Sequence, residues 1–212
     1  MSKYHYPWLR RLATPHLVVS VIILTQSGCM PRDMDLADMK AMMPPPAPQL
    51  AELNRLYGDW TTSGTIQFIA AKDPLTTTGS NSAAWECDGR FLVDRSTYDM
   101  GPLGKMSGIN IWTWDAGSGC YRLWWFDGFG ESARGTASFD AKEKAWHIRT
   151  RGTNGKCAVV SRGTIRHVDD NHLEWTWKQW DSWRIFKISE MSGTSTRKSA
   201  NQSAGVSTSN DH

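Results

Sequence analysis

The stretch INIWTWDAGSGCYRLWWFDG, residues 109–128, decides the fold of this chain. Two runs rich in aromatic and β-branched residues flank the segment DAGSG at 115–119, which has the composition of a turn. Residues of these two kinds favour strands, and a connection this short joins strands that run antiparallel. The stretch therefore predicts a β-hairpin with aromatic strands.

Turn signals of the same kind recur along the chain at intervals of about ten residues. Nearly every connection is tight, so consecutive strands are expected to be antiparallel neighbours. A meander of this length normally closes, because closure removes its exposed edges. The sequence therefore predicts an all-β fold, an up-and-down antiparallel β-barrel of about ten strands. The predicted strands are 59–71, 77–87, 90–100, 105–114, 120–127, 132–139, 145–151, 157–167, 172–178 and 183–191.

One short helix is expected before the first strand. Leu50, Leu53 and Tyr57 recur at helical spacing, and Gly58 follows as a stop signal. The predicted domain covers residues 49–198 and is capped by this helix. Residues 199–212 contain almost no apolar side chains, which predicts a disordered tail.

The N-terminus has the pattern of an export signal. A basic segment precedes the apolar run LVVSVIIL at 17–24, which is too short to span a membrane but typical of a signal peptide. Small residues and then Cys29 follow, so residues 1–28 resemble a bacterial lipoprotein signal. This resemblance implies lipidation of Cys29 and a Met- and Pro-rich linker over 29–48. The alternative is an ordinary secretory signal with Cys29 incidental.

The expected location follows from the same segment. Met30, rather than Asp, follows Cys29, and by the sorting rule of enterobacterial lipoproteins this implies anchoring in the outer membrane, facing the periplasm. The formal net charge of +3 equals the contribution of Lys3, Arg10 and Arg11 in the signal. The remainder is formally neutral, which gives no indication of a nucleic-acid partner.

Several phrases of the domain are similar to lipocalin-like (calycin) barrels. Gly58-Asp59-Trp60 has the Gly-x-Trp pattern that opens their first strand. A narrower group, of uncharacterised bacterial exported proteins in that superfamily, is similar over residues 50–198. The resemblance implies that Trp60 closes one barrel end beneath an Arg near the end of the last strand; Arg197 is the first candidate and Arg184 the second. The further matching phrases are CDGRFLV (87–93), INIWTWD (109–115), YRLWWFDGFGE (121–131) and LEWTWK (173–178).

The sequence carries no recognisable catalytic, metal or cofactor motif. It lacks a Gly-x-Ser-x-Gly elbow, a phosphate loop and zinc-ligand spacing, and no spacing singles out a carboxylate pair, which leaves a hydrolase as the least favoured alternative. A related barrel family binds haem through a His near its C-terminus, but 173–191 contains no His. We therefore expect no cofactor, no metal and no catalytic residue. The remaining cysteines, Cys87, Cys120 and Cys157, are expected to be unpaired thiols, buried or half-buried.

The faces of the strands give the candidate binding residues. Trp175 and Trp177 share the apolar face of a strand whose other face is polar, so they are expected in the barrel interior. Arg95 and Arg162 each share a face with apolar residues. They are either structural residues or polar anchors of a ligand pocket.

A second candidate surface comes from two strands that are apolar on both faces, at 105–114 and 120–127. Such strands need cover on both sides, so some of their aromatic area is expected to face outward. Trp112, Trp114 and Trp124 are the predicted members of this interaction patch.

Two functions follow. The leading prediction is a lipid-anchored, non-catalytic barrel that binds a small, mainly apolar ligand between its interior Trp residues and one or two inward Arg side chains. The alternative is an envelope structural or interaction module whose outward Trp patch contacts a protein or a glycan.

Overall fold

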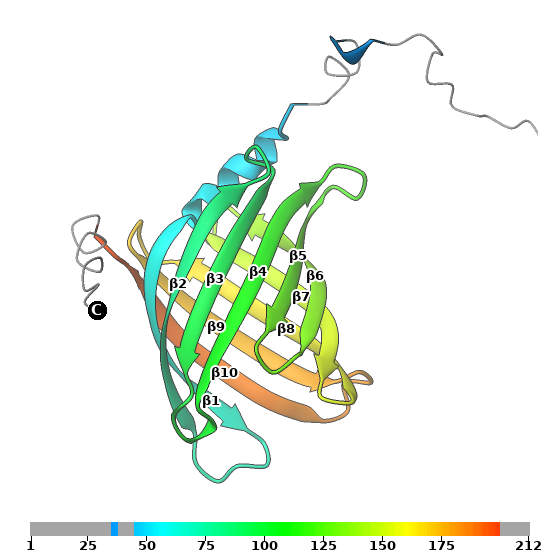
Figure 1. The fold of residues 1–212 in the computed structure, drawn as a ribbon. Coiled ribbons are helices and arrows are strands. Elements are labelled where there is room, and N and C mark those ends of the chain that lie inside the picture. Colours follow the sequence, from blue (N-terminus) through cyan, green and yellow to red (C-terminus); the bar gives the residue numbers. More distant parts are fainter. Residues whose placement is uncertain (1–34, 38–44, 200–212) are drawn as a thin grey trace, which may run out of the picture. The chain divides into compact units, whose positions relative to one another are not determined.

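The computed structural model describes residues 35–37 and 45–199. Within the unit Pro45–His212, ten antiparallel strands form a closed barrel in which each strand pairs with the next and the last pairs with the first (Figure 1). The predicted all-β, up-and-down barrel is confirmed. The strands are β1 (Gly58–Phe68), β2 (Leu75–Glu86), β3 (Phe91–Asp99), β4 (Lys105–Asp115), β5 (Cys120–Asp127), β6 (Ser132–Asp140), β7 (Ala145–Asn154), β8 (Cys157–His167), β9 (His172–Asp181) and β10 (Lys187–Arg197).

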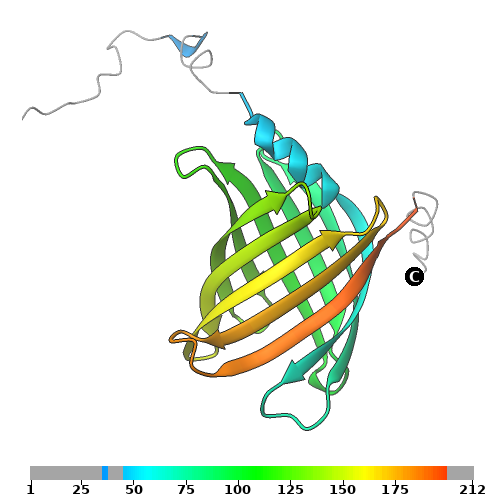
Figure 2. The ribbon, with the colours of Figure 1, turned by 180° about the vertical axis from the view of Figure 1, so that it is seen from behind.

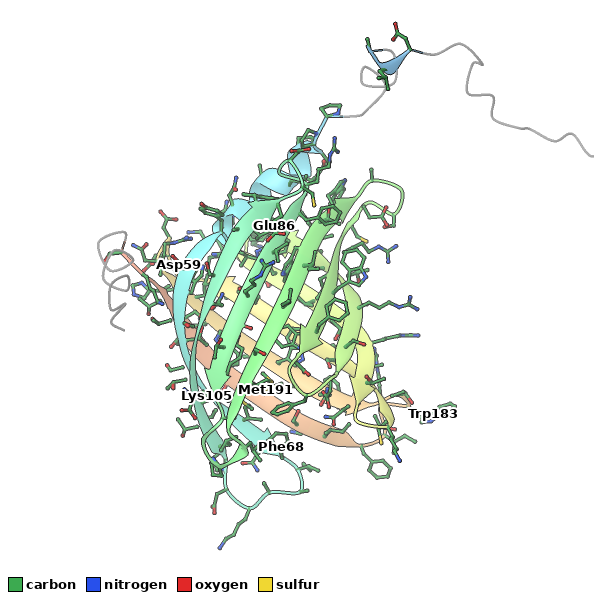
Figure 3. All side chains as sticks on the ribbon, in the orientation of Figure 1. Asp59, Phe68, Glu86, Lys105, Trp183 and Met191 are labelled. Carbon is green, nitrogen blue, oxygen red and sulfur yellow. The ribbon has the colours of Figure 1, made fainter. Side chains whose placement is uncertain are left out.

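The last strand begins later than predicted. β9 continues through Trp180 to Asp181, where a turn was expected, and β10 begins at Lys187. The Asp181 carboxylate accepts a hydrogen bond from the backbone N–H of Phe186 at 2.7 Å, and Arg184 has a left-handed backbone with φ of 60°. Trp183, predicted to open the last strand, therefore lies in the connecting loop and projects from it (Figure 3). The loop has the apolar composition of a strand, which explains why the last strand was predicted to begin too early.

A short 3₁₀ helix, η1 (Pro48–Arg55), precedes the first strand. It lies at the barrel end where β1 begins, opposite the β1–β2 connection (Figures 1 and 2). Leu50, Leu53 and Leu56 are buried against the barrel, whereas Tyr57 is exposed. The predicted helix is present, but Leu56 rather than Tyr57 completes its apolar side. A second 3₁₀ segment, η2 (Gly101–Leu103), connects β3 to β4.

An aromatic cluster fills the barrel beneath η1. The Trp146 ring packs edge-on against Tyr121, with centroids 4.8 Å apart, and against Trp112 at 5.8 Å. Trp114 contacts Tyr121 at 4.9 Å. Edge-to-face pairs of this kind add stabilisation beyond the apolar area that they bury. This end of the barrel is therefore solid core, closed by the leucines of η1.

Arg197 and Trp60 join the two ends of the meander. They are paired in the β1–β10 ladder, and the Arg197 guanidinium lies over the Trp60 ring, 4.1 Å from its centroid. The same guanidinium donates hydrogen bonds to the backbone oxygens of Asp170 at 3.0 Å, Arg55 at 3.2 Å and Tyr57. This is the arrangement that the calycin resemblance implied for Arg197. Arg184, the second candidate, lies in the β9–β10 loop instead.

The three cysteines of the described barrel are free. Cys87 and Cys157 are exposed, and only Cys120 is half-buried, so the expectation of burial is wrong for two of them. Cys87 lies in the turn between β2 and β3, and Cys157 is the first residue of β8, so both side chains reach solvent. No helix among the residues described is both long and apolar enough to cross a bilayer. The predicted signal (1–28), Cys29, most of the linker and nearly all of the tail lie outside the described residues.

Candidate ligand-binding site

A cavity of about 500 Å³ lies inside the barrel. Inner-face residues of all ten strands contribute to its wall, and the aromatic core beneath η1 bounds it at one end. At the other end its lining includes residues of the strand connections, among them Met100, Leu103 and Phe129. A volume of this size is in the range of small-molecule sites.

The lining is mainly apolar and rich in aromatic rings. Successive side chains of a strand point to opposite faces, so each strand places every second residue in the interior. Five tryptophans reach the cavity from four strands, two of them from β9. These rings, with three smaller aromatic side chains, are Trp60, Trp112, Trp125, Trp175, Trp177, Phe68, Tyr98 and Phe129.

Glycines on the inner face make room for two of these rings. A Cβ on Gly163 would lie 1.9 Å from the ring of Trp177. Cβ atoms on Gly64 and Gly193 would lie 2.7 and 2.4 Å from the ring of Trp175. Real Cβ atoms do not approach so closely, so the two Trp rings lie flat on the wall only because neighbouring strands carry glycine there. Trp175 and Trp177 thus line the cavity, on the face predicted for them.

The polar part of the wall is centred on Asp94 of β3. Its cross-strand partner is Asn110 of β4. The Asn81 side chain of β2 hydrogen-bonds to the Asp94 carboxylate. Oδ1 of Asp94 and Oδ1 of Asn110 are buried and have no hydrogen-bond partner. Burial raises the pKa of the Asp94 carboxyl from 3.8 to about 6, against the smaller opposing effect of Asn81. Near neutral pH the wall therefore holds an ionised carboxylate whose hydrogen bonds are incomplete.

Tyr98 lies on the same face of β3 as Asp94, four residues further along. Burial, together with the charge of Asp94, raises the pKa of the Tyr98 phenol to about 12. The phenol is therefore neutral at all physiological pH values, and it hydrogen-bonds to the Ser96 side chain.

Two more carboxylates lie near the mouth of the cavity. Asp127 accepts hydrogen bonds from the backbone N–H groups of Phe129 and Glu131, both at 3.0 Å, and from Trp125 Nε1 at 3.2 Å. Glu131 accepts one from the backbone N–H of Gly155 at 3.0 Å, and burial raises its pKa. These two side chains organise the β5–β6 connection and tie it to the β7–β8 turn.

Arg95 and Arg162 do not reach the cavity. Arg95 is exposed on the outer wall and pairs with Glu86 at 2.7 Å, and Arg162 is exposed on the outer face of β8. Of the two roles left open for these residues, the ligand anchor is therefore wrong, because the strand face that carries Val93 and Arg95 is turned away from the cavity. The charged residue on the inner face of β3 is Asp94, one position before Arg95.

The predicted outward patch is wrong for Trp112 and Trp114, although the outer face of β4 and β5 does expose Ile109 and Phe126. Trp112 is 2% exposed within the aromatic core, and Trp114 packs against Tyr121 on the same inner face. Only Trp124 lies on the outer face, paired across the strands with Ile111. Both faces of β4 and β5 are apolar, so the sequence did not distinguish the inner set from the outer one.

The described histidines lie away from the cavity. His167 is buried at the closed end, where burial and the nearby Arg55 and Arg197 lower its pKa to about 4, so its ring is neutral. His147 lies on the outer wall with Asp140 and Glu143, close enough for the three to share an ion. That cluster is mostly exposed, and exposed acidic groups are common without a bound metal.

Asp94 is the site residue that the sequence reasoning missed. The signal was present in FLVDRSTYD, residues 91–99, where Leu92, Asp94, Ser96 and Tyr98 form one alternating set. A carboxylate between buried residues on such a face is unusual, because ionised groups are rarely buried unless they are paired. The position of Asp94 in this set indicates a buried carboxylate on the inner face of the strand.

Known proteins share this barrel. A model of the family described as "Protein of unknown function (DUF1579)" matches residues 45–186. The crystal structure of Rv2717c from M. tuberculosis has a TM-score of 0.58 and 15% identity, covering 73% of this chain and 100% of that one. The S-type phycobiliprotein lyase CPES from Guillardia theta has a TM-score of 0.50 and 10% identity, covering 79% and 99%. No curated protein matches the sequence. At these identities the structural likeness shows the fold alone.

Proposed function

We propose that this chain, which belongs to the DUF1579 family, binds a small, mainly apolar molecule inside its barrel and leaves it chemically unchanged. The observation that carries the proposal is the interior cavity of about 500 Å³ with its aromatic wall. A filled barrel would need no such space, since protein interiors normally pack without large voids.

The residues of the wall indicate that the cavity is a binding site and not a packing defect. The Trp175 and Trp177 rings lie over glycines of neighbouring strands, so the wall is shaped by close backbone approach. Two buried polar oxygens, on Asp94 and Asn110, lack partners, and such groups are normally satisfied in a folded protein. A ligand that enters the cavity would complete both the apolar and the polar contacts.

Interior binding is favoured over the alternative functions by the direction of the tryptophans. Of the predicted patch, Trp112 and Trp114 point inward, so the outward apolar face of β4 and β5 is reduced to Trp124 with Ile109, Ile111 and Phe126, whereas five tryptophans line the cavity. The similar fold of a phycobiliprotein lyase shows that such barrels occur in a protein named as an enzyme. The carboxylates, amides and hydroxyls of the cavity wall are assigned in our proposal to binding and not to a chemical step.

Filling the cavity is expected to weaken ligand binding strongly. Ser161 is buried and lines the cavity from β8, so Ser161→Phe places a ring in the ligand space. We expect the wild-type protein to bind Nile red, a neutral apolar dye, and Ser161→Phe to weaken this binding at least tenfold. Dye fluorescence during a protein titration gives both dissociation constants.

The matched control is Ser138→Phe, the same replacement at an exposed position of β6. This variant should bind the dye as the wild type does. Circular dichroism confirms that each variant is folded before its affinity is compared. A folded wild-type protein that does not bind the dye, or equal binding by both variants, would contradict interior binding.

The proposal extends to a location in the bacterial envelope. The signal-like pattern of residues 1–28 and the following Cys29 support a lipid anchor, with the barrel facing the periplasm from the outer membrane. With the full chain expressed in a Gram-negative bacterium, we expect the N-terminal peptide of the mature protein to begin at Cys29 and to carry the mass of a diacylglyceryl group.

Cys29→Ala should lose this mass and leave the membrane fraction, whereas Cys157→Ala should retain both. Peptide mass spectrometry and membrane fractionation make the comparison. A mature N-terminus other than Cys29, without lipid, would instead support an ordinary secretory signal.

A further inference from the structure

The charges that line the cavity are all of one sign. Three carboxylates, Asp94, Asp127 and Glu131, contribute to its wall. Over residues 45–199, no Arg, Lys or His side chain contributes to it. Because a low-dielectric enclosure strengthens electrostatic interactions, a ligand with positive charge is favoured there and an anion is disfavoured.

Asp127 and Glu131 already have partners that explain their presence. Asp127 accepts three hydrogen bonds within the β5–β6 connection, and Glu131 accepts one from the β7–β8 turn. Hydrogen bonds from backbone N–H groups to a carboxylate stabilise its charged form without a cation. These two groups add negative potential at the mouth, but they do not require a ligand.

Asp94 has no such explanation. It lies deeper in the barrel, its Oδ1 has no hydrogen-bond partner, and its strand neighbour Asn110 also presents an unpartnered oxygen. Asn81 supplies a single side-chain hydrogen bond. Burying an ionised group without a counter-charge is unfavourable, so buried charges are normally paired. What is missing around Asp94 is a group that is both positively charged and a hydrogen-bond donor.

The faces of the aromatic rings in the wall suit the same kind of group. The tryptophan rings that line the cavity, among them Trp125 and Trp175, have electron-rich faces that attract cations. Their area also favours an apolar body attached to that cation. A Lys or Arg side chain of the protein itself could neutralise Asp94 in place of a ligand, but neither residue type contributes to the described wall.

We infer that the cavity selects hydrophobic amines in their ammonium form, with the charged nitrogen held by Asp94 and the apolar body enclosed by the aromatic wall. The inference rests on the proposed function and adds the chemical class of the ligand to it. The ammonium group supplies the donor that Asp94 and Asn110 lack, and the neutral phenol of Tyr98 lies on the same strand face.

Three probes of similar size separate charge from apolar contact. They are 4-phenylbutylamine, 4-phenylbutanol and 4-phenylbutanoate, titrated into the protein at pH 7.5 by calorimetry. We expect the amine to bind at least tenfold more tightly than the alcohol, and the carboxylate to bind more weakly than both. If none of the three probes binds and Nile red also fails, the proposed function itself is wrong. If the alcohol binds as tightly as the amine, only the charge inference is wrong.

Asp94→Asn tests the residue directly. The variant keeps the size of the side chain and removes its charge, so the amine should bind no more tightly than the alcohol, while the affinity for the alcohol changes less than twofold. The control is Asp59→Asn, which removes the same charge at the closed end of the barrel (Figure 3), outside the cavity wall. The control should retain the preference of the wild type for the amine.

The melting temperature of the ligand-free protein gives a second test, because a purely structural role of Asp94 predicts the opposite change. Because the buried charge of Asp94 is unfavourable in the empty cavity, Asp94→Asn should melt at a higher temperature than the wild type at pH 7.5. A preference for the amine that survives in Asp94→Asn would overturn the inference, as would a lower melting temperature combined with equal loss of all three affinities.

Discussion

Trp60→Ala is expected to lower the free energy of unfolding by about 3–5 kcal/mol, the usual range for removing a fully buried large aromatic side chain. Trp60 is 1% exposed, and its Nε1 donates a hydrogen bond to the backbone oxygen of Leu56 at 3.1 Å. Its ring also lies beneath the Arg197 guanidinium. The substitution therefore leaves a cavity where β1, β10 and the end of η1 meet, and it removes the surface on which Arg197 rests.

Urea denaturation followed by far-ultraviolet circular dichroism measures this change, provided that the slope with denaturant stays constant. Trp183→Ala is the matched control, because Trp183 is 83% exposed and its replacement should change stability by no more than about 0.5 kcal/mol. A loss of less than about 1 kcal/mol in Trp60→Ala would show that this end of the barrel does not depend on the Trp60 ring.

Leu53→Ala is expected to cost about 2–5 kcal/mol. Leu53 is fully buried and belongs to the same cluster as Trp112 and Trp146, so it anchors η1 to the closed end of the barrel. Hydrogen bonds from the Tyr121 hydroxyl to the backbone oxygen of Gln49 at 2.7 Å and from Trp85 Nε1 to Asn54 Oδ1 at 2.8 Å also hold η1. A 3₁₀ helix of this length has little stability of its own, so the expected loss reflects weaker attachment of η1 as well as the missing side-chain volume.

The control is another leucine in a 3₁₀ segment. Leu103 of η2 is 54% exposed, so Leu103→Ala should change the free energy of unfolding by much less than Leu53→Ala. Both variants are measured by the same denaturant titration. Equal losses in the two would contradict the view that η1 closes the barrel as part of its core.

The strand pattern was largely predictable from the sequence. Turn signals between short aromatic and β-branched runs gave nine strands within a few residues of their observed bounds, and the Gly-x-Trp phrase placed Trp60 in the first strand. The last strand was displaced because Trp183, Ile185 and Phe186 look like strand residues, although the structure leaves all three exposed in a loop. Composition alone does not reveal that Asp181 ends the preceding strand by capping that loop.

The candidate site was less predictable. Trp175 and Trp177 were placed correctly because their strand alternates cleanly between apolar and charged residues. In β3 both faces mix apolar with charged residues, and in β4 both faces are apolar. The same reasoning therefore chose Arg95 instead of Asp94 and predicted that Trp112 faces outward. Alternation divides a strand into two sets of residues, but it identifies the inner set only when one set is polar.

The amino-acid sequence by itself determined the period of the strands, the tight turns between them and, through these, an antiparallel meander that closes. These features depend on residues near one another in the chain, since backbone preferences and turn geometry are local. Only the tertiary structure decided which face of each strand is inside, and hence that Asp94 rather than Arg95 faces the cavity. That choice depends on neighbours from other strands: Asn81 and Asn110 beside Asp94, and glycines of β1, β8 and β10 beneath the Trp rings. The charge of the cavity arises from closure of the barrel, which brings these distant residues together.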